Sequence, residues 1–252
     1  MSRAPAPAGF VVPDWPAPPS VRACVTTRAL AGASAPPFDR FNLGDRCGDA
    51  PAAVAANRAA LVTLAQLPAP PRWLRQVHGA RVVDADGAAG GEAPQADAAV
   101  THRAGAVLAI LTADCLPVIF CSDDGGAVGA AHAGWRGVAA GVLEATVAAL
   151  RVAPARLLAW IGPGIGAASY EVGAEVRDAF VGADARDADA FVATRLGHWR
   201  CDLSALARRR LAAAGVERVH GGAFDTYRDE RFYSYRRERA TGRFATLIWI
   251  AP

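Results

Sequence analysis

The chain has 252 residues, of which 52% are hydrophobic, and it carries a net charge of +3 at pH 7. This length suits one α/β domain and allows a large core that needs no disulfide or structural metal. The sequence contains no apolar run as long as a membrane span, and its Pro- and Ala-rich first twenty residues lack the apolar core of a signal peptide. We therefore expect a cytoplasmic protein with no membrane partner, in which residues 1–20 form an extended arm and residues 21–252 form one domain.

All 27 basic residues are arginines, and they are spread along most of the chain. Nucleic-acid binding requires a face on which basic residues are concentrated, so this class of function is not favoured. No repeat of fixed period and no long polar linker divides the sequence. Nothing in the sequence indicates a protein partner.

Short apolar runs predict strands, and a 3.6-residue spacing of apolar residues predicts helices. In chain order, the predicted strands are residues 21–26, 73–77, 81–83, 106–111, 118–121, 127–131, 157–161 and 244–250. The predicted helices are residues 51–64, 137–151, 172–180 and 202–214, and the predicted loops include residues 38–44 and 87–95.

Local signals support several of these boundaries. Asp49 is a start signal for the first helix, Asp202 can cap the last helix, and Gly215 can end it. The turn at residues 123–126 joins two apolar runs into a hairpin-like pair. Because strands and helices alternate irregularly, we predict an α/β fold built as a mixed-sheet layered sandwich rather than a doubly wound sheet.

Three residues with metal-binding or nucleophilic side chains follow predicted strands. They are His78, Cys115 and His132. Strand ends can bring residues that are distant in the sequence to one edge, and two imidazoles with one thiolate form a reasonable zinc site. Three protein ligands would leave the fourth tetrahedral position for water or substrate, as in catalytic zinc sites.

The isolated residues have a structural interpretation as well. A single histidine at a strand end is more often a hydrogen-bonded structural residue, and a single cysteine in an apolar stretch is more often part of the core. The context favours the functional interpretation, because Asp114 and Pro117 fix the chain around Cys115. The other four cysteines, at positions 24, 47, 121 and 201, are expected to be reduced, buried apolar residues.

Specific segments also connect the chain with a known family. They are Thr26-Thr27-Arg28, Phe41-Asn42-Leu43-Gly44, Gln76-Val77-His78-Gly79, Ala96-Asp97-Ala98, Thr112-Ala113-Asp114-Cys115-Leu116-Pro117, His132-Ala133-Gly134-Trp135-Arg136-Gly137, Ile161-Gly162-Pro163-Gly164-Ile165, Tyr170-Glu171-Val172-Gly173, Ser234-Tyr235-Arg236-Arg237 and Thr241-Gly242-Arg243. Together they resemble the YfiH-type family. This family is also labelled multicopper polyphenol oxidase or laccase-like, and its members are described as purine nucleoside phosphorylases. The segments around Cys115 and His132 are the most specific.

The resemblance implies that His78, Cys115 and His132 are the zinc ligands and the catalytic centre. It implies a layered α/β fold shared with cysteine-hydrolase-like and toxin deamidase domains, so residues 21–252 would be one catalytic domain. The implied substrates are phosphate and purine nucleosides, namely adenosine, inosine and S-methyl-5'-thioadenosine. Adenosine deamination is a further implied activity. The family usually has a Cys-Thr pair where this chain has Asp225-Thr226, so a second thiol near the pocket is expected to be absent.

Several residues are candidate substrate contacts. Arginine binds phosphate in bidentate fashion, which suggests Arg136, at a predicted helix start beside Gly134, and Arg236. Arg236 could also belong to a solvated basic segment. Asn42, Arg75 and Tyr170 lie in or beside the matching segments and are further expected contacts.

Alternative functions remain at this point. Deamination would require a carboxylate that moves protons, for which Asp114 is the nearest candidate, although it could instead orient the loop or a ligand histidine. Cys115 and His132 could form a metal-free nucleophile–base dyad of an amidase or deamidase. The same ligands suit a single copper, as in a polyphenol oxidase, but five histidines without a His-x-His pair cannot build a multicopper cluster. A non-enzymatic metal or nucleoside sensor is the last possibility.

Overall fold

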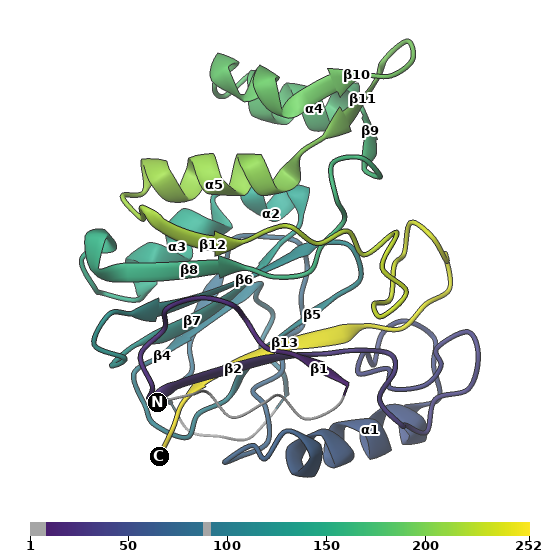
Figure 1. The fold of residues 1–252 in the computed structure, drawn as a ribbon, viewed down its shortest axis with the longest axis vertical. Helices are drawn as coiled ribbons and strands as arrows, with labels where there is room; N and C mark the ends of the chain where they lie inside the picture. The colour runs from purple at the N-terminus through teal and green to yellow at the C-terminus, as the bar shows by residue number, and fades with distance from the viewer. Residues whose placement is uncertain (1–8, 88–91) are drawn as a thin grey trace.

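The computed structural model describes residues 9–87 and 92–252. Two sheets form its centre (Figure 1). The four-stranded sheet is antiparallel and has the order β1 (Phe10–Val11), β2 (Val21–Thr26), β13 (Phe244–Ile250) and β5 (Leu108–Thr112). The six-stranded sheet has the order β12 (Arg218–Gly221), β8 (Leu157–Ile161), β6 (Leu116–Ser122), β7 (Val128–Ala133), β4 (Ala98–Thr101) and β3 (Val82–Asp84). This second sheet is mixed, because its two outermost pairs are parallel and the others antiparallel.

Helices cover the outer face of each sheet (Figure 1). The four-stranded sheet is covered by α1 (Pro51–Leu64). The six-stranded sheet is covered by α2 (Trp135–Ala139), α3 (Val142–Ala149) and α5 (Leu203–Ala213). A small antiparallel sheet of β10 (Phe191–Ala193), β11 (His198–Cys201) and β9 (Glu171–Gly173) lies with α4 (Ala174–Val181) beyond α5. Two 3₁₀ helices span Pro154–Arg156 and Ala185–Ala190.

Successive side chains along a strand point to opposite faces of its sheet, and this explains why each sheet has a core on both sides. In β5, Leu108 and Ile110 point into the core between the two sheets, whereas Ala109 belongs to the core under α1. In β6, Ile119 faces the same central core and Phe120 faces the helices of the other side. Because strands buried on both faces carry apolar residues at every position, they form the continuous apolar runs seen in the sequence.

The structure confirms the predicted mixed-sheet α/β sandwich and many of its elements. The strands predicted at 21–26, 157–161 and 244–250 and the helix predicted at 51–64 have the expected bounds. The hairpin is confirmed as β6 paired with β7. The last helix is confirmed too, because the Asp202 side chain accepts a hydrogen bond from the Ala205 N–H at 2.8 Å and Gly215 follows at φ +84°.

Three predicted elements are wrong in type or extent. Residues 73–77 do not form a strand: they contain one isolated bridge, between Arg75 and Gln95, and the Asp97 side chain accepts the backbone N–H groups of Val77 and His78. The helix predicted at 137–151 is broken into α2 and α3 at Gly141, whose φ of +86° is left-handed. The helix predicted at 172–180 begins only at Ala174, because Glu171–Gly173 pairs with β11.

Two smaller predictions also differ from the structure. Asp49 was expected to start α1, but the N-cap residue is Ala50, which makes no side-chain capping hydrogen bond. The Asp49 carboxylate instead accepts a hydrogen bond from the Ser34 hydroxyl. Within the predicted arm of residues 1–20, Phe10–Val11 pairs with β2 and Trp15 is buried in the core. Residues 1–8 of that arm and residues 88–91 of the predicted loop lie outside the described residues. No helix within the described ranges is long and apolar enough to cross a bilayer.

Candidate metal centre and active site

Three separate segments bring His78, Cys115 and His132 together. His132 lies in β7, where it pairs with Pro117 of β6, and Cys115 immediately precedes β6. His78 comes from the loop before β3. All three residues were expected just after a strand, and Cys115 does follow β5 closely. His132 instead lies within its strand, and His78 follows residues 73–77, which do not form a strand.

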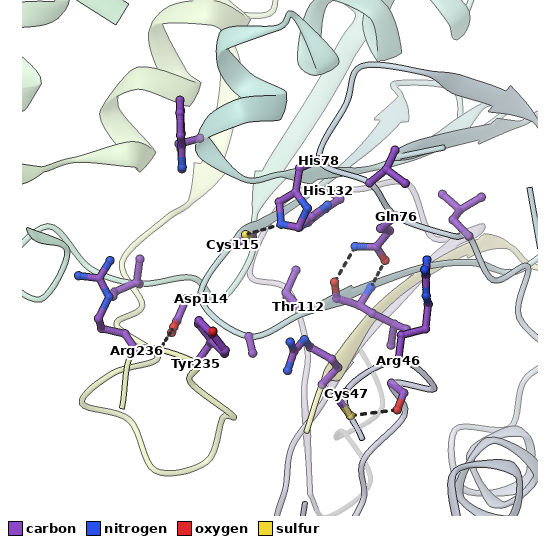
Figure 2. A pocket seen from close by; sticks show the side chains of 18 of the residues that line it. Arg46, Cys47, Gln76, His78, Thr112, Asp114, Cys115, His132, Tyr235 and Arg236 are labelled. Carbon is purple, nitrogen blue, oxygen red and sulfur yellow. Dashed lines mark hydrogen bonds between the residues drawn. The ribbon is translucent and has the colours of Figure 1, made fainter. Parts of the chain in front are cut away.

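The ligand atoms of these three residues face one another (Figure 2). They all lie within 4.8 Å of each other. The Cys115 Sγ atom is 3.9 Å from Nε2 of His78, and the two imidazole rings meet edge to face with centroids 4.7 Å apart. His132 is buried, Cys115 is partly buried and His78 is exposed, so the cluster is open on one side.

The donor set matches a catalytic zinc site. A tetrahedral zinc would hold sulfur and nitrogen ligands about 3.6 Å apart, close to the separation of Cys115 and His78. Among the described residues, three side chains supply ligands, so a tetrahedral zinc would have one coordination position left for a substrate. The arrangement is therefore a possible His-Cys-His metal site.

Asp97 is a positioning residue that the sequence did not reveal. Its carboxylate is fully buried and accepts a hydrogen bond from Nδ1 of His132 at 2.8 Å. The same carboxylate accepts backbone N–H groups of Val77, His78 and Gly79. Asp97 therefore fixes the ring of one candidate ligand, leaving its Nε2 for a metal, and fixes the backbone of the other. Its segment was noted only as a family match.

The electrostatics of the cluster favour a thiolate. Burial raises the pKa of the Cys115 thiol, but the charge of His132 and hydrogen bonds with both histidines outweigh it and lower the pKa to about 6. For His132, burial lowers the pKa, but the negative Cys115 and the hydrogen bond with Asp97 raise it to about 9. Near neutral pH the metal-free cluster therefore pairs a Cys115 thiolate with a protonated His132, and a metal that binds there must displace the proton of His132.

Two residues at the centre have unusual backbone conformations. His78 has φ 63° and Asp114 has φ 92°, in the left-handed region that non-glycine residues rarely occupy. The conformation of His78 is held by a hydrogen bond from its backbone N–H to Asp97. The conformation of Asp114 is held by the hydrogen bonds that its side chain accepts from Thr226 and Arg236. Gly134 allows the backbone to lie close to Cys115, because a Cβ atom at this position would be 2.9 Å from Cys115 Sγ. Such strain is typical of functional sites.

The cluster forms part of a pocket of about 760 Å³. Six of the predicted site residues line it: His78, Asp114, Cys115, His132, Tyr170 and Arg236. Several other lining residues were not predicted as site residues, namely Arg46, Cys47, Gln76, Thr112, Trp135, Tyr235 and Arg243. Most of them lie in loops that meet only through tertiary folding.

Asp114 acts on the loop that carries Arg236. Its carboxylate accepts hydrogen bonds from the Thr226 hydroxyl at 2.7 Å and from the Arg236 backbone N–H at 2.7 Å. The Arg236 guanidinium donates to the Glu171 carbonyl at 2.7 Å and lies over the Tyr170 ring. Both oxygens of Asp114 therefore already have partners, which favours the loop-orienting interpretation over a proton-moving role.

Three predicted substrate contacts do not line this pocket. Asn42 is fully buried beneath its wall. Arg75 donates to Gln95 on the surface. The Arg136 guanidinium stacks on the Trp135 ring at 4.4 Å. Each of these arginines is next in sequence to a residue that lines the pocket, Gln76 or Trp135, but does not line the pocket itself.

The thiol expectations also need correction. Cys47 is only half-buried and lines the pocket, where its Sγ atom lies 3.2 Å from the Gly44 carbonyl oxygen. A second thiol is thus present in the pocket, although at another position than the family cysteine. Asp225, which replaces that cysteine, accepts hydrogen bonds from the Ser169 hydroxyl and the Gly166 N–H and supports the neighbouring turn.

Comparisons with known proteins place this site in a family. The profile of the family described as multi-copper polyphenol oxidoreductase laccase matches residues 22–251. The chain is 53% identical to a purine nucleoside phosphorylase of Xylella fastidiosa, covering 97% of this chain and 98% of that protein. It is 48% identical to the purine nucleoside phosphorylase YfiH of Escherichia coli, covering 96% and 98%.

Solved structures agree with this relationship. A Neisseria meningitidis protein superimposes with a TM-score of 0.93 at 45% identity, covering 97% of this chain and all of that one. YlmD from Geobacillus stearothermophilus gives a TM-score of 0.88 at 29% identity, covering 100% and 98%. The chain is thus an α/β sandwich with a possible His-Cys-His metal site in its pocket, and it belongs to the YfiH-type family of laccase-domain proteins. Its likeness to cysteine-hydrolase-like folds stays a prediction.

Proposed function

We propose that the protein is a zinc-dependent purine nucleoside phosphorylase acting on adenosine, inosine and S-methyl-5'-thioadenosine. The observation that carries this proposal is the joining of the His78–Cys115–His132 cluster with arginines and aromatic rings in one pocket. The relatives named purine nucleoside phosphorylase support the same activity. As a single catalytic domain with reduced thiols, the protein is expected to act in the cytoplasm.

Phosphorolysis makes three demands on the protein. Phosphate must be held against C1′ of the ribose, positive charge developing at C1′ must be stabilised, and the departing purine must receive a proton. Arginines that line the pocket can bind the phosphate dianion, and the exposed ring of Tyr235 can stack on a purine. Asp114 holds the Arg236 loop in place around them. Zinc bound by the three ligands would supply Lewis-acid polarisation of a substrate atom.

Adenosine deamination is proposed only as a side activity. It requires a carboxylate that transfers protons, and the carboxylates lining the pocket are Asp45 and Asp114. The first is paired with Arg58 and the second with Thr226 and Arg236. Phosphorolysis also needs a proton for the departing purine, but that proton does not have to come from a carboxylate, so phosphorolysis is the preferred function of this geometry.

The copper and metal-free alternatives have weaker support. A multicopper cluster needs more histidines than the five in this chain, although one copper could occupy the same ligands. A Cys115–His132 dyad would use the thiolate as a nucleophile, with His78 only assisting by lowering the thiol pKa, whereas a metal would use both histidines directly as ligands. The presence of stoichiometric zinc and the absence of a covalent intermediate would separate the proposed function from both.

The test begins with metal analysis of the purified protein, followed by incubation with inosine or adenosine with and without phosphate. Hypoxanthine or adenine formed only with phosphate supports phosphorolysis, whereas inosine formed from adenosine without phosphate reports deamination. Cys115→Ala should lose zinc and activity together. Retention of both by this variant would show that the proposed centre is wrong.

A further inference from the structure

One wall of the pocket carries two arginines that the metal cluster does not use. Arg46 lies in the loop between β2 and α1, and Arg243 immediately precedes β13. Figure 2 shows Arg46 and Cys47 on one side of the pocket and Asp114 with Arg236 on the other, with Thr112 between them. The pocket thus has two separate basic regions.

A buried asparagine joins the two segments of this wall. Asn42 accepts hydrogen bonds from the backbone N–H groups of Gly44 and Arg243 at 2.8 and 2.7 Å. Its amide donates to the Gly44 carbonyl and the Asp49 carboxylate. Because Asn42 is fully buried, these bonds fix the register between residues 42–49 and 241–243.

Gly44 lets the two segments approach closely. A Cβ atom at Gly44 would lie 2.7 Å from Cγ of Arg243, so the stem of that arginine passes directly over the glycine. One nitrogen of the guanidinium, Nη1, donates to the carbonyls of Thr241 and Gly242. The Arg243 head is therefore anchored while its remaining N–H groups stay available.

In the described part of the chain, neither neighbouring acidic residue forms an ion pair with Arg46 or Arg243. Asp45 pairs with Arg58 at 3.3 Å, and Asp49 accepts hydrogen bonds from Ser34 and Asn42. Arg46 itself is exposed and has no hydrogen bond or ion pair with any residue in the described part of the chain. By contrast, the Arg236 guanidinium on the other side is bonded to the Glu171 carbonyl.

We infer that Arg46 and Arg243 form a subsite for a phosphate group, and that its occupant in the reaction is inorganic phosphate. Two forked guanidinium groups from separate loops can bind a tetrahedral dianion from two directions. A neutral nucleoside offers no such charge. This inference rests on the proposed function, and it replaces Arg136 and Arg236 as the main phosphate ligands with Arg46 and Arg243.

The test compares Arg46→Gln and Arg243→Lys with the matched control Arg22→Gln. Arg22 is exposed on β2 and does not line the pocket. Binding of inorganic phosphate is measured by calorimetry, and KM for phosphate and for inosine by initial rates. For Arg46→Gln we expect phosphate affinity to fall about tenfold or more, since hydrogen bonds to charged groups are the strong ones. KM for inosine should change less than about twofold, because inosine does not contact Arg46 in the proposed arrangement.

Arg243→Lys keeps the charge and the stem but loses the fork, so we expect a smaller loss of phosphate affinity than in Arg46→Gln. Wild-type phosphate affinity in Arg46→Gln would overturn the inference, as would an equal loss in Arg22→Gln. A further arm replaces inorganic phosphate with inosine 5′-monophosphate. Arginine-dependent binding of the nucleotide without binding of inorganic phosphate would overturn the assigned occupant. Calorimetry needs no turnover, so an inactive wild type that binds phosphate would count against the proposed function and not against the subsite.

Discussion

The Asp97 carboxylate lies 2.8 Å from Nδ1 of His132, and both side chains are buried. Burial raises the pKa of Asp97, but the hydrogen bonds from His132 and from the backbone of His78 and Gly79 outweigh it, so the pKa stays below its ordinary value. An ionised Asp97 keeps the proton of His132 on Nδ1 and its Nε2 toward Cys115. One carboxylate thereby sets the position of two of the three candidate metal ligands.

The first prediction concerns this carboxylate. Asp97→Asn should lower zinc affinity about 10- to 100-fold, because an amide cannot accept all the hydrogen bonds that the carboxylate accepts. Competition with a chelating dye measures the change. The matched control is Asp86→Asn, since Asp86 also accepts hydrogen bonds from a strand residue, Thr101, and the backbone of His102, but does not line the pocket. Equal zinc affinity in wild type and Asp97→Asn would contradict the positioning role.

A second prediction follows from the space around Gly134. In Gly134→Ala the new methyl group would lie 2.9 Å from Cys115 Sγ and 3.2 Å from Cδ2 of His78, so these groups must move. We expect weaker zinc binding and lower activity, with the overall fold kept. Gly87→Ala is the control, since its methyl group would meet no atom of the described residues within 4 Å. Unchanged zinc binding in Gly134→Ala would mean that Cys115 and His78 are not both ligands.

The fold could be predicted largely from the sequence because its strands are buried on both faces. Residues 157–161 and 244–250 are continuous apolar runs with clear ends, and their bounds were predicted correctly. The break at Gly141 was missed because apolar spacing continues across it, although a glycine within a helical pattern was the available signal. Tertiary pairing with β11 overrode the predicted helix at residues 172–173.

The candidate site could be predicted only in part. Specific segments identified Cys115 and His132, and the structure brings them together with His78. Asp97 could not be assigned a role, because its partners come from residues 77–79 and from His132, far apart in the sequence. Arg46 and Arg243 were missed for the same reason, since Asn42 joins their loops only in the folded chain. Asn42 was predicted to contact substrate, but the structure shows it holding the wall.

The third prediction is a pH dependence of thiol reactivity in metal-free protein. The pKa of Cys115 is lowered to about 6, so its thiolate predominates above that pH and decreases below it. Alkylation of Cys115 by iodoacetamide should therefore rise between about pH 5 and 7 and level off above, whereas an ordinary thiol, with a pKa of about 8.5, keeps rising to pH 9. Mass spectrometry of the separate peptides follows each cysteine.

Cys24 is the internal control for this experiment, because burial raises its pKa to about 12 and it should stay unreactive. Added zinc should protect Cys115 if the thiolate is a ligand. A Cys115 profile that still rises steeply between pH 7 and 9 would contradict the lowered pKa. Persistent alkylation at stoichiometric zinc would instead favour the metal-free dyad.

The last prediction concerns Thr112, which lines the pocket between the metal cluster and the Arg46 side (Figure 2). Thr112 is only 1% exposed, and its Oγ1 has no hydrogen-bond partner among the described residues. A buried hydroxyl without a partner destabilises the free protein, and a substrate hydroxyl could satisfy it. Thr112→Val should therefore stabilise the free protein by about 1 kcal/mol and yet raise KM for inosine about three- to tenfold. Thr112→Ser keeps the hydroxyl and should retain substrate affinity, as measured by initial rates and by thermal unfolding. If valine lowers stability and leaves KM unchanged, Thr112 packs in the wall without contacting the substrate.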